Sequence, residues 1–105
     1  MDVPGLTLTV TTLVNHWYRF MSKVGMQSTA STGTFEARLL EDGINIDYTD
    51  ATAYANSQRQ CIGITLRQPA PGTHVYKLQA VSDAAAAQIP FSVVQNNLSI
   101  EDIGL

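Results

Sequence analysis

The residues of this sequence that carry reactive chemistry are few and widely spaced. The two histidines are His16 and His74, and no serine stands in a Gly-x-Ser-x-Gly frame that would pair a nucleophile with a base. Neither Cys-x-x-Cys nor His-x-x-x-His occurs, so the ligand spacing of a zinc site is missing. We therefore expect no enzyme and no catalytic, cofactor-binding or metal-binding residue. Both histidines should be strand residues whose ring nitrogens are hydrogen-bonded.

The acidic residues gather in the stretch "EDGINIDYTD", which contains Asp42, Asp47 and Asp50. Loop carboxylates hold calcium in many proteins, but this spacing departs from that of the twelve-residue calcium loop. We interpret the three aspartates as turn-forming and solubilising residues and leave calcium binding by them open. No G-x-G-x-x-G pattern and no Walker lysine is present to cradle a phosphate.

The single cysteine, Cys61, lies in the apolar run "CIGITL". A small hydrophobic side chain packs well in such a run, and one thiol cannot form an internal disulfide. The sequence predicts a buried, unreactive thiol. A reactive thiol and an intermolecular bridge are the alternatives.

Composition limits the partners of this chain. Its 105 residues are 45% hydrophobic and 14% charged, which fits one folded domain over 1–105. A net charge of −3 lacks the basic excess that nucleic acid or an anionic membrane attracts. No run of 18 apolar residues suits a membrane span, and Asp2 stands where a signal peptide would carry positive charge. We expect neither nucleic-acid binding nor membrane insertion.

The elements that must position these residues have a two-residue period. "GLTLTVTTLV" alternates leucine or valine with threonine, as a half-buried strand does, and Asp42-Gly43 separates two alternating runs, as in a β-hairpin. Turn signals recur every 8 to 12 residues, which predicts an antiparallel β-sandwich or jelly roll. The expected strands are 5–14, 16–24, 34–41, 44–48, 59–68 paired with 73–81, 91–95 and 98–103, with a loop over 25–33 and a short strand or helical turn within 82–89.

Several aromatic residues fall within the expected strands and exceed what one small core needs. They belong either to the core or to an outer sheet face that packs against a neighbouring subunit. The candidates for this trimer interface are Trp17, Tyr18, Phe20, Tyr76 and Phe91.

The polar stretch "TDATAYANSQ" contains Tyr54 and Asn56. An aromatic ring among small polar residues suits an adaptable contact, so these two residues are candidates for receptor contact. A structural anchor for the loop is the alternative for Tyr54.

The stretch "PGTHVYKLQA" and the chain end "LSIEDIGL" resemble a known family, the tumour necrosis factor/C1q-like jelly-roll heads on fibres and other virion appendages of tailed bacteriophages and prophages. The matching residues are Gly72–Gln79 without Val75, then Leu98 and Ile100–Ile103. The hairpin "LLEDGINI" resembles the Leu-Asp-Gly-apolar middle element of that family. The likeness runs from Thr34 onward, and the first third matches only in character.

The resemblance implies a homotrimeric, TNF/C1q-like jelly roll that forms the C-terminal part of a longer fibre protein, after a collagen-like or coiled-coil stalk. It implies a non-enzymatic structural protein of the virion, assembled in the cytoplasm of the bacterial host. Its partners would be two further copies of itself and a host surface glycan or protein. A lectin-like, carbohydrate-binding β-sandwich attached to an enzyme is the alternative function.

Overall fold

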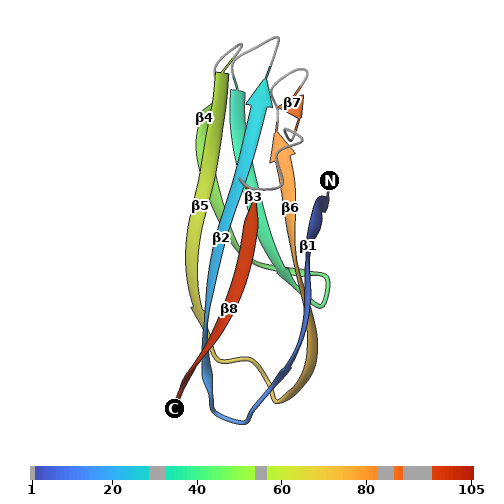
Figure 1. Cartoon of the computed structure of the whole chain (residues 1–105), viewed down its shortest axis with the longest axis vertical. Helices are drawn as coiled ribbons and strands as arrows, with labels where there is room; N and C mark the ends of the chain where they lie inside the picture. The colour runs from blue at the N-terminus through green and yellow to red at the C-terminus, as the bar shows by residue number, and fades with distance from the viewer. Residues whose placement is uncertain (1, 29–32, 54–56, 83–86, 89–95) are drawn as a thin grey trace.

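The structure is a computed structural model that describes residues 2–28, 33–53, 57–82, 87–88 and 96–105. Every regular element in these ranges is a β-strand, and they hold no helix with the length and hydropathy of a membrane span. The molecule is elongated, with extents of 47 × 20 × 20 Å, and its strands run roughly along the long axis (Figure 1). The predicted all-β class is confirmed.

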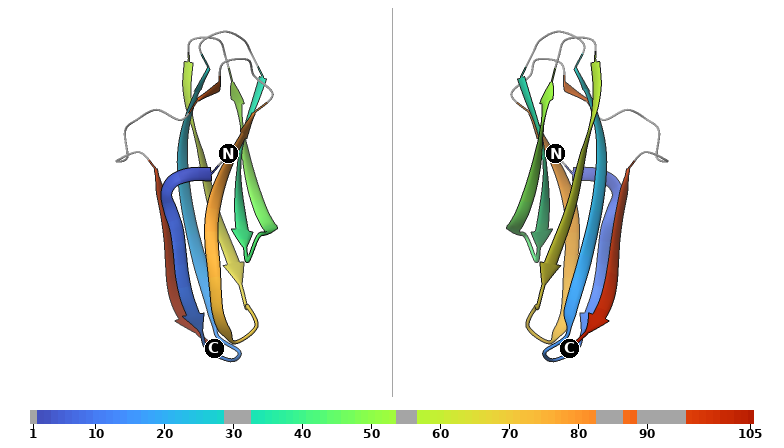
Figure 2. Two further views of the ribbon diagram at one scale, coloured as in Figure 1. Left: turned by 90° about the vertical axis from the view of Figure 1, so that its right-hand side faces the viewer. Right: turned by 90° about the vertical axis from the view of Figure 1, so that its left-hand side faces the viewer.

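The strands form two antiparallel sheets, consistent with a β-sandwich. Sheet A contains, in order, β1 (Asp2–Thr12), β6 (Gly72–Ser82), β3 (Gly33–Glu41) and β4 (Ile44–Ala53). Sheet B contains β5 (Ser57–Arg67) and β2 (Trp17–Ser28), with β7 (Ala87–Gln88) and β8 (Asn97–Gly104) both on the other side of β2. Figure 2 shows β1 and β8, the edge strands of different sheets, lying side by side.

The alternation read in the sequence corresponds to burial in β1. Leu6 is buried, whereas Thr7, Thr9 and Thr11 are exposed. Because successive side chains of a strand point to opposite faces, this pattern turns the apolar residues of β1 toward sheet B. The predicted solvent-exposed face of this strand, formed by its threonines, is therefore confirmed.

The β3–β4 hairpin forms where the sequence predicts it. Asp42 and Gly43 both have positive φ, at 50° and 85°. A two-residue turn with this geometry matches the right-handed twist of antiparallel strands, and Asp-Gly is among the pairs that adopt it most readily. The turn thus brings Asp42 and Glu41 to one end of sheet A.

The predicted pairing of β5 with β6 is wrong. β5 pairs with β2 in sheet B, whereas β6 lies between β1 and β3 in sheet A. Both edges of β6 are hydrogen-bonded to other strands, so no edge is left for β5. The residues from Gln68 to Pro71 cross from one sheet to the other, and Gly72 begins β6 with a φ of 127°.

Further differences concern the limits of the strands. The predicted loop over 25–33 is shorter, because β2 continues to Ser28 and β3 begins at Gly33. His16 lies in the β1–β2 connection instead of a strand. Within the stretch 82–89, β7 is a two-residue strand, which is one of the two predicted alternatives, and the predicted strand 91–95 lies outside the described residues.

The core contains side chains from both sheets, including three of the five aromatic residues predicted for a trimer interface. Tyr18, Phe20 and Tyr76 are at most 3% exposed, and the rings of Phe20 and Tyr76 lie 4.6 Å apart. The trimer-interface assignment is therefore wrong for these three residues, because their rings fill the space between the sheets. Trp17 is 42% exposed, and Phe91 lies outside the described residues.

Candidate functional site

The outer face of sheet B is apolar, although nothing in the described chain covers it. Its large exposed side chains come from β2 and β5, and we call them the apolar face. They are Trp17, Met21, Ile62, Ile64 and Leu66, which are 42 to 65% exposed.

Strand register makes these side chains neighbours. On β2, Met21 lies opposite Ile64 of β5, and Arg19 lies opposite Leu66. Side chains directly opposite one another on one face of an antiparallel pair are about 5 Å apart at their Cβ atoms. Met21, Ile62, Ile64 and Leu66 therefore form one cluster, unlike the singly scattered hydrophobic residues normal on a monomer, and Trp17 lies beyond Arg19 on β2.

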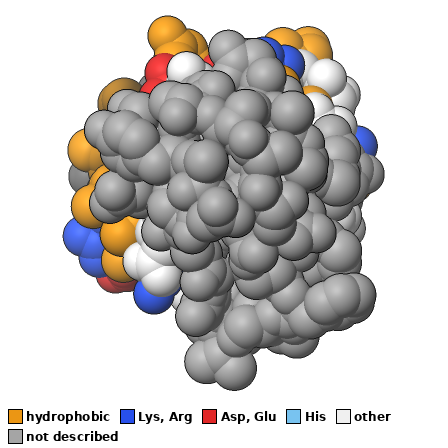
Figure 3. Space-filling view, turned by 90° about the horizontal axis from the view of Figure 1, so that it is seen from above, with side chains coloured by type: hydrophobic (Ala, Val, Ile, Leu, Met, Phe, Trp, Pro, Cys, Tyr) orange, Lys and Arg blue, Asp and Glu red, His pale blue; other side chains and the backbone are white. Residues whose placement is uncertain are grey.

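Charged residues border this surface along β2 and β8. Arg19 forms an ion pair with Glu101 of β8, and Lys23 lies opposite both Ile62 and Asn97. Figure 3, a view along the long axis, shows hydrophobic and basic side chains next to each other at the perimeter of the molecule. An apolar centre with a polar border is the usual anatomy of a protein interface.

The outer face of sheet A has a different character. Three exposed threonines, Thr7, Thr9 and Thr11, follow one another along β1. Opposite them on β6 stand Lys77 and Thr73, together with the half-exposed Val75. Water solvates the β1–β6 half of this face well, and Tyr48 of β4 is exposed in the other half. The row of large aliphatic side chains on neighbouring strands therefore distinguishes sheet B.

The inward side of β5 explains why its large aliphatic residues point outward. Cys61 is buried, and Gly63, Thr65 and Arg67 follow it on the inner side. Gly63 lets β5 approach β4 closely, because a Cβ there would lie 2.8 Å from Thr49 Cγ2. Only small or hydrogen-bonded residues fit on this side of β5.

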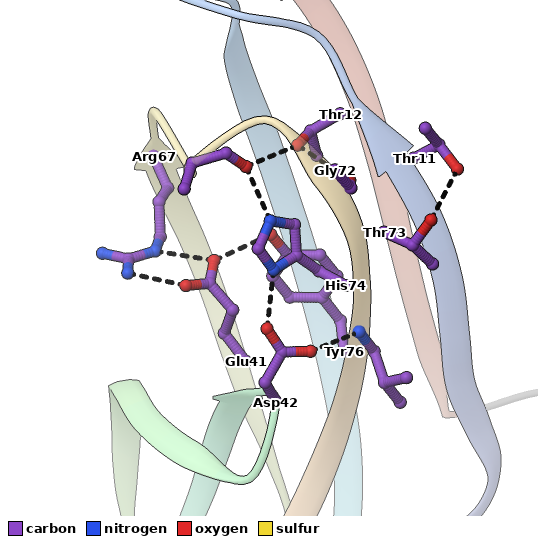
Figure 4. A network of polar contacts seen from close by, with 11 residues as sticks. Thr11, Thr12, Glu41, Asp42, Arg67, Gly72, Thr73, His74 and Tyr76 are labelled. Carbon is purple, nitrogen blue, oxygen red and sulfur yellow. Dashed lines mark hydrogen bonds and ion pairs between the residues drawn. The ribbon is translucent and has the colours of Figure 1, made fainter.

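A polar cluster joins the two sheets at the end that carries the β3–β4 turn (Figure 4). Arg67 of β5 donates two hydrogen bonds to Glu41 of β3, at 2.7 and 2.8 Å. The Tyr76 hydroxyl donates a third at 2.7 Å. The hydrogen bond from Arg67 holds the pKa of Glu41 below its usual value. Burial and the bond to Glu41 raise the pKa of Tyr76.

Asp42 and His74 form the second half of the cluster. The His74 ring lies 2.6 Å from Asp42 through Nδ1 and 2.6 Å from the Ala70 carbonyl oxygen through Nε2. Asp42 also accepts a hydrogen bond from the backbone N–H of Val75, and this bond is the main reason why the pKa of Asp42 is lowered. Thr12 donates to Ala70 as well. These bonds fasten the crossing from β5 to β6 onto the β3–β4 turn.

The cluster has the residue types of an acid–base site, but its side chains are hydrogen-bonded to one another and hold the two sheets together. We call this set, formed by Glu41, Asp42, Arg67, His74 and Tyr76, the clamp. Both nitrogens of His74 face oxygen atoms that accept hydrogen bonds, which favours the ring with both nitrogens protonated, and neither nitrogen points to open space as that of a base would. The Tyr76 hydroxyl and the Arg67 guanidinium point to the same carboxylate of Glu41. As predicted, His74 is a hydrogen-bonded residue, and so is His16, whose ring contacts Asp102.

Replacing His74 with glutamine should destabilise the protein more at pH 6 than at pH 8.5. The hydrogen bond to Asp42, and then the bond to the Ala70 carbonyl, raise the pKa of His74. A raised folded-state pKa contributes stability that is full below the unfolded value of about 6.5 and is lost as pH rises through the folded value. We expect a difference of about 0.5–1 kcal/mol between the two pH values in urea unfolding. Equal destabilisation at both pH values would contradict the hydrogen bonds of a protonated His74 ring to Asp42 and to the Ala70 carbonyl oxygen.

The remaining predicted site residues are scattered. Asp42 belongs to the clamp, Asp47 contacts Thr65 on the inner side of β5, and Asp50 is exposed on β4. In the described part of the chain no three metal-ligating side chains gather in one place. The predicted receptor contacts Tyr54 and Asn56 lie outside the described residues.

The Cys61 prediction is confirmed as far as burial is concerned. The side chain is 1% exposed, and its Sγ contacts the Phe35 carbonyl oxygen at 3.8 Å. Burial raises the pKa of the Cys61 thiol, which lowers the fraction present as reactive thiolate.

Sequence reasoning missed the apolar face. The alternation of Ile62, Ile64 and Leu66 with smaller residues was visible, but large aliphatic residues ordinarily mark the buried side of a strand. The predicted burial of Cys61 was the signal that could have revealed this face, because alternation then places Ile62 on the opposite, outward side of the strand.

Comparison with protein-family models and with curated proteins finds no match to this sequence.

Proposed function

We propose that this chain is a non-enzymatic structural module that assembles as a homotrimer and forms the head of a tail fibre or related appendage of a tailed bacteriophage or prophage. The observation that carries the proposal is the apolar face of sheet B. Exposed apolar surface of this extent favours association, at about 25 cal/mol for each Å² removed from water before the cost of association is subtracted. The fibre context comes from the family resemblance of the sequence.

The finer fold that we propose is a jelly roll, the fold of that family. The strand order supports this proposal, because between β1 and β7 every connection except the β3–β4 turn passes from one sheet to the other. Such crossings belong to the Greek-key connections from which jelly rolls are built. An immunoglobulin-type sandwich would place the first strand beside the second, whereas here β1 lies beside β6 and β8 lies beside β2.

In this proposal the protein works in the virion, after assembly in the cytoplasm of the bacterial host. Three copies form the end of the fibre, and exposed loops contact a glycan or protein on the host surface. The loop with Tyr54 and Asn56 remains our candidate for that contact. Catalysis has no part in this role.

Many carbohydrate-binding modules hold a sugar chain by stacking it on several aromatic rings of one face. The exposed aromatic rings in the described residues are Trp17 and Tyr48, and they belong to different sheets. Two rings on separate faces cannot stack on one sugar chain together. This arrangement gives the trimeric module more support than the carbohydrate-binding module.

Native mass spectrometry and light scattering test the proposed function. We expect a particle of three times the 11.4 kDa chain mass at micromolar concentration. A monomer that binds oligosaccharides would instead support the lectin-like module. A monomer without sugar binding would contradict both functions.

A further inference from the structure

We propose that the outward side of β5 lies on the three-fold axis of the trimer, where it meets the same strand of two other copies. This inference rests on the proposed function and names the surface that performs it. We call the outward side chains of β5 the axial column. They are Gln60, Ile62, Ile64, Leu66 and Gln68, of which the last follows the end of the strand directly.

The position of β5 permits this contact. β5 is an edge strand of sheet B, and β2 occupies its other side. An edge strand can approach a symmetry axis closely, whereas a central strand is kept away by its neighbours. β5 also runs along the long dimension of the molecule (Figure 1), so the axial column is roughly parallel to the proposed fibre.

The composition of the axial column favours copies of itself as the occupants. Side chains on a three-fold axis meet the same side chains of the other two copies, so a charged side chain there would be repelled by two like charges. The axial column holds no charge, and its apolar centre is Ile62, Ile64 and Leu66. Gln60 and Gln68 stand at its two ends. An amide is both donor and acceptor, so three Gln60 side chains can hydrogen-bond to one another, whereas the Gln68 amide already donates a hydrogen bond to the Asn15 carbonyl oxygen of its own chain. Identical residues can therefore form apolar layers, about 6.7 Å apart along each strand.

Charge is compatible with a second and third copy. The chain carries a net charge of −3, whereas the outer face of sheet B carries Arg19 and Lys23 against Glu101. Arg19 and Lys23 lie on β2, beside the axial column and off the axis. Around a three-fold axis they would therefore face the acidic remainder of a neighbouring copy and not their own equivalents.

Cysteine cross-linking tests the axis directly. In a Cys61→Ser background, Ile64→Cys places one thiol of each copy at the axis, and mild oxidation should yield covalent dimers within trimers. The matched control is Thr9→Cys, on the exposed outer face of sheet A, which should stay uncrosslinked. Only a residue near a symmetry axis meets its own equivalent, so a shared patch elsewhere would leave Ile64→Cys uncrosslinked. That result in a trimer would overturn the axis and leave the proposed function intact.

A charge at the same position gives the second test. Ile64→Lys should convert the trimer to a monomer at concentrations where the wild type is trimeric. The side chain is 65% exposed in the single chain, so the strand signal in circular dichroism should remain. Thr9→Lys is the control and should stay trimeric. A trimeric Ile64→Lys variant would overturn the proposed axis, as would a wild-type dimer that cross-links through position 64. A wild-type monomer would overturn the proposed function as well.

Discussion

Replacing Glu41 with alanine should lower the free energy of unfolding by about 2–3 kcal/mol at pH 7. The Glu41 side chain is only 12% exposed and accepts hydrogen bonds from Arg67 and Tyr76. The variant leaves a guanidinium and a largely buried hydroxyl without their acceptor. Chemical denaturation at one fixed protein concentration measures the loss, because self-association adds to the apparent stability.

A double-mutant cycle separates the lost partner from a simple loss of packing. Tyr76→Phe removes only the hydroxyl and should cost about 1 kcal/mol. Combined with Glu41→Ala it should cost less than the sum of the two single changes, since the hydroxyl that Glu41→Ala leaves unpaired is already gone. Additive losses would contradict the shared hydrogen bond.

Acid should reduce the effect of Glu41→Ala. The hydrogen bond from Arg67 lowers the pKa of Glu41 below the ordinary 4.5. A lowered folded-state pKa contributes stability that is full above the unfolded value and is lost as pH falls through the folded value. The wild type should therefore approach the variant in stability as the pH drops below about 4.

The clamp and the axial column are linked through β5. Arg67 is drawn inward to Glu41, and alternation then turns Leu66 and Ile64 outward. The polar cluster thus fixes which side of β5 is available for association. The pair is partly buried, with the Arg67 side chain 39% and the Glu41 side chain 12% exposed. Because such a pair is often no more stabilising than an apolar replacement, we infer that it serves to fix the orientation of β5.

Most of the strands followed from local pattern alone. The Thr-Leu alternation of β1 and the Asp42-Gly43 turn depend on residues adjacent in the sequence, and the structure contains both. The sheet to which each strand belongs could not be predicted from local pattern. The sequence shows a corner after β5, but it does not show that β1 and β3 already occupy both edges of β6.

The candidate sites illustrate the same limit. His74 and Asp42 stand 32 positions apart, and only the fold places them 2.6 Å from each other. The orientation of β5 depends on Thr49 and Asp47 of β4, in the other sheet. A pattern within one strand cannot reveal which side its neighbour leaves room for.

Replacing Gly63 with valine should cost about 3 kcal/mol, and Gly63→Ala about 1–2 kcal/mol. The added Cβ would lie 2.8 Å from Thr49 Cγ2 and 3.0 Å from Ser22 Oγ. Thr49 is β-branched and stiff at χ1, so it cannot swing away without strain. Thermal unfolding of these variants beside the wild type measures the loss. Because β5 carries the axial column, the proposed trimer should also weaken.

A second substitution identifies the contact responsible. Thr49→Ser deletes the Cγ2 methyl that the new Cβ meets, so Gly63→Ala with Thr49→Ser should regain most of the lost stability, while Thr49→Ser alone should have a small effect. Without the clash, Gly63→Ala would stabilise the strand, because glycine carries an entropic cost in a strand of about 0.5–1 kcal/mol relative to alanine. A stabilised Gly63→Ala variant would therefore contradict the close approach of β5 to β4. It would also remove the steric reason for the outward orientation of Ile62 and Ile64.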